Sequence, residues 1–545
     1  MRHRLPAGLE PAVDPATALG RRGDSHQPDP PARAGTRRGT APLHRDSPSG
    51  RRPGRAGVPS RVRRGEPGGP AGVLERGGRG GPGNRGGRDL LAPAAPLRGL
   101  GPAPEIPRPR RGDGARQRIA LADGSFRLKR WAAAGNFPCR GSEAAVRRPL
   151  AGLRVIDLGS RVSAPFCSAI LGEQGAEVIK IEEPVRGDRL RELGPYAQDD
   201  DGEPYSLYWS VEGRGRKSVT IDLRRPQGQE LLRCLADSSD VVVESFRPGT
   251  LERWNIDPSR LSPHLVTARF SLFGQDGPKS LVVGLNGSAL AFSGLMHLTG
   301  DPDRAPARPG VNIAGYLSGV FAAQAVTSLL YERDARGTGT GGVIDVFMYG
   351  SILRIMEWTI AAHDRLGMVR NRSGDSLDIA APVGNYPSRD GRYVYLVGGS
   401  QVFFERLCRA MDRPDLAVDE RFANAAARAD NRTEINALVA RWVSELDADE
   451  AEARLVACDV PAGKIYDVAD FASDEHVEAR GDICTVQDPV IGPVRQQAPF
   501  PRLVGETPAA PEGAPRLGEH TDEVLSSVVG LSATELDALR ADGII

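Results

Sequence analysis

The chain has 545 residues, enough to bury a substantial core, and its formal net charge is only +1. That balance hides two opposed segments, because residues 1–148 hold about 30 basic against about 12 acidic side chains and the remainder is acidic. No run of about 18 apolar residues indicates a membrane span. The six cysteines are scattered without a CxxC pair, which argues against zinc and against a disulfide framework. We expect a cytoplasmic protein without a metal or a membrane partner.

Residues 1–148 consist largely of arginine, glycine, proline and alanine, a composition typical of disorder. A nucleic-acid-binding tail would need aromatic side chains between its RGG units, and none precedes Phe126. A transit peptide would be shorter and able to form an amphipathic helix. We favour translation of GC-rich DNA upstream of a misplaced start. The true start would then lie near Val146, because the next methionine is Met296. We expect no nucleic-acid partner.

An ordered domain is predicted from about residue 149 to 365. A short apolar strand, a helix and a second strand follow one another with the spacing of a βαβ unit, and further strands alternate with a helix that begins at Pro226. This alternation predicts a Rossmann-like α/β domain. The predicted strands are 153–158, 176–182, 217–223, 240–246 and 264–274, and the first helix is 163–175.

The first strand–helix turn lacks the Gly-x-Gly-x-x-Gly pattern, so a dinucleotide site of the usual kind is not expected. The turn from Gly159 to Ser163 still places backbone N–H groups at a helix N-terminus, which suits an anion such as a pyrophosphate. Arg161 and Val162 are therefore candidate cofactor-binding residues. A simple helix start without a ligand fits the same turn.

Beyond these strands we expect a long helix over 316–332, a strand over 343–347 and one helix through about His363. A polar linker over 370–378 then leads into a smaller α+β domain, residues 366–500. Residues 501–545 are predicted to return to the large domain and to end in helices.

Seven segments follow one another in a fixed order from about Pro149 to the C-terminus. They are PLAGLRVIDLGS, GAEVIKIEEPVRGD, KSVTIDLRRPQGQELL, DVVVESFRPGTLERW, SLFGQDGP, SGLMHLTGDPD and LGEHTDEVL. Together they resemble the class III CoA-transferases, which include formyl-CoA:oxalate and carnitine CoA-transferases. The resemblance implies a ring-shaped chain that interlocks with a second chain as a dimer, and coenzyme A, as acyl-CoA, bound to the large domain.

By motif position, Ser245, Phe246 and Arg253 correspond to residues that contact the nucleotide and the pantetheine in this family. A guanidinium at Arg253 suits a phosphate group. The resemblance further implies covalent catalysis by one aspartate, which exchanges acyl groups through an anhydride and a thioester. In this family the aspartate directly precedes a long helix, and Gly315 occupies its place here.

The sequence offers no evident substitute for that carboxylate. No acidic residue lies between Asp303 and Glu332, Ser318 would need a base, and Asp301 belongs to a turn. The racemase branch of the fold is not favoured either. Its histidine and aspartate positions fall on Gly284-Leu285-Asn286 and on Gly315, and His297 fits a structural role.

Three functions remain open at this stage. The chain is a CoA-transferase acting on an acyl-CoA and a carboxylic acid, a non-catalytic acyl-CoA-binding subunit that pairs with an active homologue, or a pseudoenzyme. It would act as a homodimer or as a heterodimer with a related chain. A second glycine-rich segment, Gly398-Gly399-Ser400-Gln401, is either a lid or a turn in which Ser400 caps a helix.

Overall fold

The computed structural model describes residues 147–258, 260–375, 380–505 and 510–545. The predicted disordered tail, residues 1–148, lies outside the described residues except for Arg147 and Arg148.

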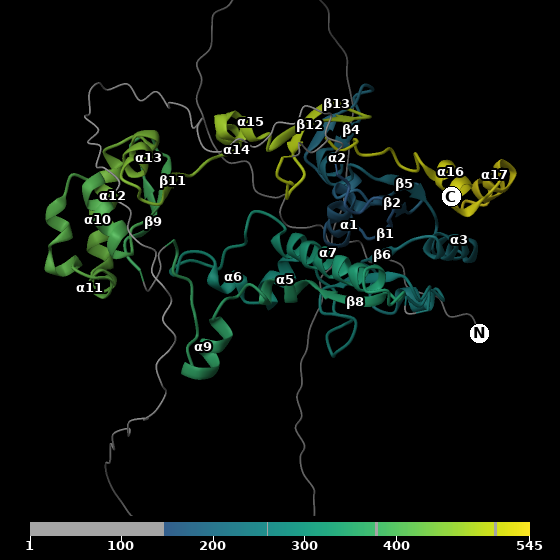
Figure 1. The fold of residues 1–545 in the computed structure, drawn as a ribbon, viewed down its shortest axis with the longest axis horizontal. Helices are drawn as coiled ribbons and strands as arrows, with labels where there is room; N and C mark the ends of the chain where they lie inside the picture. The colour runs from purple at the N-terminus through teal and green to yellow at the C-terminus, as the bar shows by residue number, and fades with distance from the viewer. Residues whose placement is uncertain (1–146, 259, 376–379, 506–509) are drawn as a thin grey trace, which may run out of the picture. The chain divides into compact units, whose positions relative to one another are not determined.

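A six-stranded parallel sheet forms the centre of the large domain (Figure 1). Its strand order is β5-β2-β1-β6-β7-β8, and every neighbouring pair is parallel. The chain therefore builds outward from β1 on one side and then crosses to the other side. The strands are β1 (Arg154–Leu158), β2 (Glu177–Glu182), β5 (Lys217–Thr220), β6 (Val241–Glu244), β7 (Val266–Ser271) and β8 (Gly342–Phe347).

Both faces of this sheet are buried, because successive side chains along a strand point to opposite faces. Val155 belongs to the core beneath α1 and α7, whereas its neighbour Ile156 belongs to the core beneath α3 and the C-terminal helices. Continuous apolar strands are what a parallel sheet covered on both faces requires. The sequence-based prediction of a mixed α/β fold with a parallel sheet is confirmed.

Helices and short strands of the large domain connect and cover this sheet. Helices α1 (Ser163–Glu173) and α7 (Ile313–Asp334) pack against each other. The remaining elements are η2 (Arg189–Glu192), β3 (Tyr196–Gln198), β4 (Pro204–Ser206), α2 (Leu207–Glu212), α3 (Pro226–Asp237), α4 (Thr250–Arg253), α5 (Asn286–Phe292), α6 (Leu295–Leu298), α8 (Met348–Leu353) and α9 (Thr359–Leu366).

Two helix boundaries differ from the sequence-based prediction. The single helix predicted through about His363 is two helices, α8 and α9. The segment between them contains Glu357, whose backbone has φ +52 and so cannot continue a right-handed helix. Helix α7 begins at Ile313, three residues earlier than predicted. Gly315 therefore lies within the first turn of α7 rather than before it.

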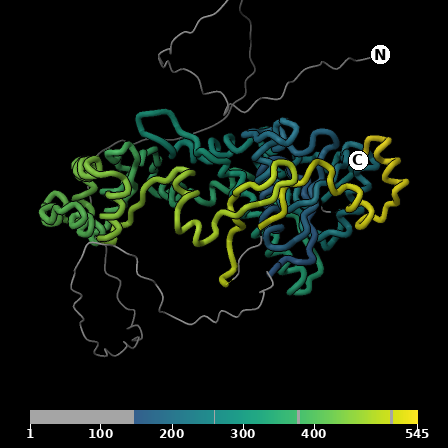
Figure 2. The backbone as a smooth tube through the Cα atoms, turned by 90° about the horizontal axis from the view of Figure 1, so that it is seen from above, coloured from purple at the N-terminus to yellow at the C-terminus, as the bar shows by residue number. Residues whose placement is uncertain are grey.

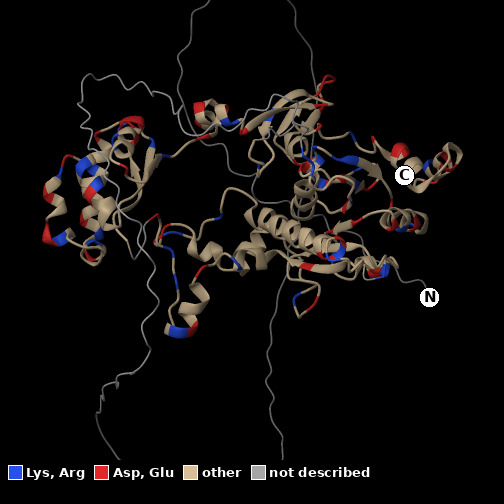
Figure 3. Ribbon diagram, viewed as in Figure 1, with Lys and Arg blue, Asp and Glu red and all other residues tan. Residues whose placement is uncertain are grey.

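Helix α7 is long and apolar enough to cross a membrane by length and composition. In the described residues, however, it packs against α1 and the sheet, and nine of its residues are buried. Figure 3 shows it almost free of charge until its C-terminal end. A helix that packs one face into the core of a domain passes the same test, and part of the apolar surface of α7 stays exposed at Val320 and Phe321.

The smaller domain contains a three-stranded antiparallel sheet, in the order β11-β10-β9, that packs with helices around its own core. Its elements are β9 (Val383–Pro387), β10 (Tyr393–Val397), α10 (Gln401–Ala410), η3 (Pro414–Ala417), η4 (Glu420–Phe422), α11 (Ala425–Asp430), α12 (Arg432–Ser444), α13 (Ala448–Ala457), β11 (Ala462–Lys464), α14 (Val468–Ser473) and α15 (Glu475–Arg480).

The C-terminal part of the chain contacts the large domain again (Figure 2). Asp488 in the hairpin accepts a hydrogen bond from Ser210 at 2.6 Å, and the N–H of Gly518 donates to Ser218 at 2.9 Å. This segment contains the hairpin β12 (Ile483–Asp488) and β13 (Gly492–Gln497), then α16 (Thr521–Val524), a π-helical turn η5 (Leu525–Val529) and α17 (Ala533–Ala541).

Candidate functional site

The order in which the chain adds strands to the sheet reverses between β1 and β6. The strands β2 and β5 lie on one side of β1, whereas β6, β7 and β8 lie on the other. In open α/β sheets, ligands bind beyond the carboxyl ends of the strands at such a point. The loops that follow β1 and β6 meet here, since the N–H of Ser160 donates to Ser245 Oγ at 3.0 Å. The structure thus brings the turn of Arg161 and Val162 next to Ser245.

A buried ionic cluster fixes the turn after β1. Asp188 Oδ1 accepts the N–H of Arg161 at 3.0 Å, and Asp188 Oδ2 lies 3.0 Å from Lys180 Nζ. Lys180 also donates to the carbonyl of Gly159. Burial alone would raise the pKa of Asp188, but Lys180 and two backbone N–H groups outweigh it and lower the pKa. A charged carboxylate therefore holds the backbone of Arg161, whose φ is +67.

The turn after β6 is held in a similar way. Glu244, the last residue of β6, accepts the N–H of Phe246 at 2.7 Å and is paired with Arg269 at 2.7 Å. Burial raises the pKa of Glu244 although Arg269 opposes the shift. The ring of Phe246 meets Trp254 edge to face, with centroids 5.1 Å apart. Two buried carboxylates thus position the two predicted ligand-binding turns.

Arg253 lies at the end of α4, directly after the β6 turn. Its Nη2 donates to Thr250 Oγ1 at 2.9 Å, and its side chain is exposed. Among the described residues it forms no ion pair with a carboxylate. Its guanidinium therefore keeps donors free for a phosphate group.

Gly315 lies against the first of these turns. A Cβ at position 315 would be 3.5 Å from Val162 Cγ1 and 3.9 Å from the backbone N of Ser163, which are ordinary contacts. The structure thus brings together Gly315 and Val162, which are more than 150 positions apart in the sequence. A side chain could start from position 315 without displacing its neighbours.

Asn286 holds the N-terminus of α7 beside Gly315. Its Oδ1 accepts the N–H groups of Ala314 at 2.9 Å and of Gly315 at 3.3 Å. Its Nδ2 is buried and has no hydrogen-bond partner. Sequence reasoning noted Asn286 only as a replaced racemase position and missed this role, since nothing local signals a cap supplied from another helix.

A network of two hydrogen bonds between polar side chains also adjoins the site, and the sequence analysis did not predict it. Tyr316 donates to Glu212 Oε1 at 2.7 Å, and Asn312 donates to the hydroxyl of Tyr208 at 3.0 Å. Burial raises the pKa of Glu212, although the hydrogen bond from Tyr316 opposes the shift. These contacts join α2 to the start of α7 across about a hundred residues of sequence, so no spacing pattern could indicate them.

The other residues considered as chemical substitutes have structural partners. Ser318 Oγ is buried and donates to the carbonyl of Ala314 at 2.6 Å. Asp301 Oδ1 accepts the N–H of Asp303 at 2.9 Å in an exposed turn. His297 Nε2 lies 3.0 Å from Asn371 Oδ1. The five cysteines in the described part of the chain are free, and no cluster there has the side chains to hold a metal ion.

The glycine-rich segment of the small domain is packed tightly. A Cβ at Gly399 would be 2.8 Å from the Cβ of Ala380, and Arg428 donates to the Gly399 carbonyl at 2.9 Å. Ser400 caps α10 through the N–H of Phe403 at 3.2 Å. These contacts are those of a strand–helix turn in which Ser400 caps the helix.

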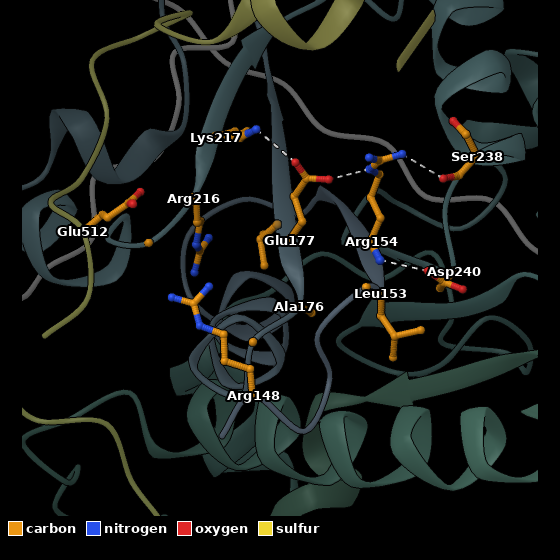
Figure 4. Close-up of a pocket in the computed structure, with 14 residues that line it drawn as sticks. Arg148, Leu153, Arg154, Ala176, Glu177, Arg216, Lys217, Ser238, Asp240 and Glu512 are labelled. Atoms are coloured by element: carbon orange, nitrogen blue, oxygen red, sulfur yellow. Dashed lines mark hydrogen bonds and ion pairs between the residues drawn. The ribbon is translucent and has the colours of Figure 1, made fainter. Parts of the chain in front are cut away.

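A polar cavity of about 410 Å³ lies at the opposite edge of the sheet (Figure 4). Its wall includes Arg154, Glu177 and Lys217, which are the first residues of β1, β2 and β5. Glu177 is paired with Arg154 at 2.6 Å and with Lys217 at 3.0 Å. Glu177 thus pairs with both cations, and the cavity lies at the amino ends of the strands, away from the carboxyl ends where the candidate site lies.

Comparison with known proteins agrees with the sequence resemblance. Residues 150–521 match the family described as CoA-transferase family III. A succinyl-CoA–D-citramalate CoA-transferase of Chloroflexus aurantiacus is 37% identical over 73% of this chain and 98% of its own length. The alpha subunit of a succinyl-CoA–L-malate CoA-transferase from that organism is 39% identical over 73% of this chain and 92% of its own.

The fold has a solved counterpart in a CAIB/BAIF family protein from Brucella suis. Its structure superimposes with a TM-score of 0.63 at 30% sequence identity. The match covers 70% of this chain and 100% of that chain.

Proposed function

The chain belongs to CoA-transferase family III, and on that premise we propose that it transfers coenzyme A from an acyl-CoA to a carboxylic acid at the β1–β6 switch point, with Gly315 in place of the usual aspartate. The observation that carries this proposal is the meeting of three separate segments. The turns after β1 and β6 are joined by the Ser160–Ser245 hydrogen bond, and the start of α7 adjoins Val162.

Each of these segments has a distinct role. The N-terminus of α1, from Val162 onward, binds the pyrophosphate of coenzyme A, while the N–H of Arg161 is held by Asp188. Ser245 and Phe246 contact the pantetheine, and Arg253 supplies donors to a phosphate. Position 315 faces the thioester, where the family's aspartate would attack it.

The relatives suggest the chemical class of the substrates. Both are named as enzymes that use succinyl-CoA with a hydroxylated dicarboxylic acid. We infer succinyl-CoA as a donor and a dicarboxylic acid as an acceptor for this chain.

The second candidate is a non-catalytic acyl-CoA-binding subunit that partners an active homologue. The absence of a carboxylate at position 315 favours it, as does the alpha-subunit name of one relative. The two candidates separate in a single assay, because only a transferase converts succinyl-CoA and an added acid when the purified chain acts alone.

Association with a second chain is part of the proposal. Helices α7 and α9 and the segments around them expose several large apolar side chains, which a second chain could cover. These side chains are Val320, Phe321, Trp358, Ile360 and Leu366. We propose that two such chains, each ring-shaped with a Rossmann-like large domain, interlock as a dimer that acts in the cytoplasm.

Calorimetric titration of coenzyme A into the full chain tests the site. Arg253→Ala is expected to raise the Kd about 10- to 100-fold, since a charged hydrogen bond contributes about 1.5–3 kcal/mol. Arg260→Ala is the matched control, because Arg260 is exposed and pairs only with Asp257 in the described residues. Equal Kd values for both variants would contradict this placement of coenzyme A.

A further inference from the structure

At the start of α7, a glycine at position 315 lies beside Asn286, whose side-chain N–H donor has no hydrogen-bond partner. Gly315 presents no side-chain atom, and the nearest atoms to an added Cβ are at van der Waals distance. In the adjoining carboxamide of Asn286, Oδ1 is occupied by two backbone N–H groups, whereas the buried Nδ2 is unpaired. A buried donor left unpaired costs about 1–3 kcal/mol, so an acceptor supplied here is stabilised.

No acidic residue close to Gly315 in the sequence could serve as this acceptor, since none lies between Asp303 and Glu332. In the described structure, Glu212 of the adjoining network already accepts from Tyr316 at 2.7 Å, and Asp188 beside the neighbouring turn is paired with Lys180 at 3.0 Å. These two carboxyl groups are therefore held by their own partners. The N-terminus of the 22-residue helix α7 favours an incoming anion.

We propose that the acceptor acid places its own carboxylate over Gly315, next to Asn286 Nδ2, and attacks the donor thioester directly in place of an enzyme side chain. This inference rests on the proposed function, because it requires acyl-CoA in the β1–β6 site. The ligand is a carboxylate of the acceptor, and Asn286 is its binding residue.

The chemistry balances without any further reactant. A carboxylate oxygen of the acceptor bonds to the thioester carbonyl carbon, and the C–S bond breaks to give a mixed anhydride and CoA thiolate. The thiolate then attacks the acceptor's carbonyl carbon. The C–O bond on that side breaks, and the donor acid leaves as its carboxylate. No proton is consumed, and the bridging oxygen departs with the donor acid.

Oxygen labelling in a single turnover distinguishes this route from covalent catalysis. The full chain, in excess over succinyl-CoA, is mixed with L-malate or D-citramalate carrying ¹⁸O in both carboxylates. We expect the released succinate to carry one ¹⁸O atom. The Gly315→Asp variant should release unlabelled succinate in its first turnover, because its own side chain supplies the bridging oxygen.

Unlabelled succinate released by a wild-type chain that transfers CoA would overturn the inference. Transfer of CoA by the Gly315→Asp variant but not by the wild-type chain would overturn it too. If neither protein transfers CoA, the proposed function is contradicted for these acids as well, so the two failures can be told apart.

Asn286→Asp provides a second test that preserves the fold. The substituted side chain still offers an oxygen to the N–H groups of Ala314 and Gly315, but it loses the donor and adds a negative charge. The KM for the acid should rise at least tenfold while the KM for succinyl-CoA stays unchanged. A parallel change in both KM values, or no change, would contradict a role in acid binding.

Discussion

Glu212 is a buried carboxyl whose ionisation opposes folding. Burial raises its pKa above the ordinary value of 4.5. As the pH rises past 4.5, the unfolded chain loses this proton while the native chain keeps it. Stability therefore falls until the native group also ionises, and then stays lower. Glu212→Gln removes this loss, so the variant should have the higher Tm, by a margin that grows as the pH rises from 4.5.

Thermal unfolding of both proteins between pH 4 and 8 measures that margin. Glu203→Gln is the control, since Glu203 is exposed in the described structure. A Tm difference for Glu212→Gln that grows nowhere in this range, or that shrinks with rising pH, would show that burial does not raise this pKa.

At the level of single residues, the sequence indicated the site only where a motif carried it. Ser245 and Gly315 followed from motif positions, and Arg161 and Val162 followed from a strand–helix turn that suits an anion. The described structure brings the turn of Arg161 and Val162 next to Ser245 and to Gly315 in α7. Asn286, by contrast, acts through contacts between elements distant in sequence. Such contacts depend on tertiary packing, which leaves no local periodicity or spacing to read.

At the level of elements, two glycines of α7 differ in what surrounds them. A Cβ at Gly315 would make ordinary contacts, whereas a Cβ at Gly319 would lie 3.0 Å from Phe166 Cβ and from the carbonyl of Ser163. Gly315→Ala should therefore raise the free energy of unfolding by about 0.5–1 kcal/mol, because alanine has less backbone freedom to lose. Gly319→Ala should lower it by about 1–3 kcal/mol through overpacking against α1.

Urea unfolding of the two variants tests whether their free energies of unfolding change in opposite directions. A loss of stability in Gly315→Ala comparable to that in Gly319→Ala would mean that position 315 has no room for a side chain. The proposed placement of an aspartate there would then be wrong.

Secondary structure was predictable where apolar periodicity was strong. The strands β1, β2 and β8 and the helices α1 and α3 fall within a few residues of their predicted positions. The break between α8 and α9 was missed, because the apolar pattern continues through a turn that only the positive φ of Glu357 reveals. The short strands β3 and β4 were also missed, since three residues carry no period.

At the level of the whole molecule, exposed apolar side chains on α7 and α9 predict association of two chains. Light scattering coupled to size exclusion should give twice the chain mass of 58.2 kDa at micromolar concentration. A mass of 58.2 kDa would contradict the homodimer and favour pairing with a related chain.

The central claim is that the site is complete except for a carboxylate at position 315. Mass spectrometry of the full chain and of Gly315→Asp, after incubation with succinyl-CoA and trapping with hydroxylamine or borohydride, tests it most directly. We predict an adduct that maps to position 315 in the variant and an unmodified mass in the wild-type chain. A variant that binds coenzyme A yet stays unmodified, or a wild-type adduct at any residue, would contradict the claim.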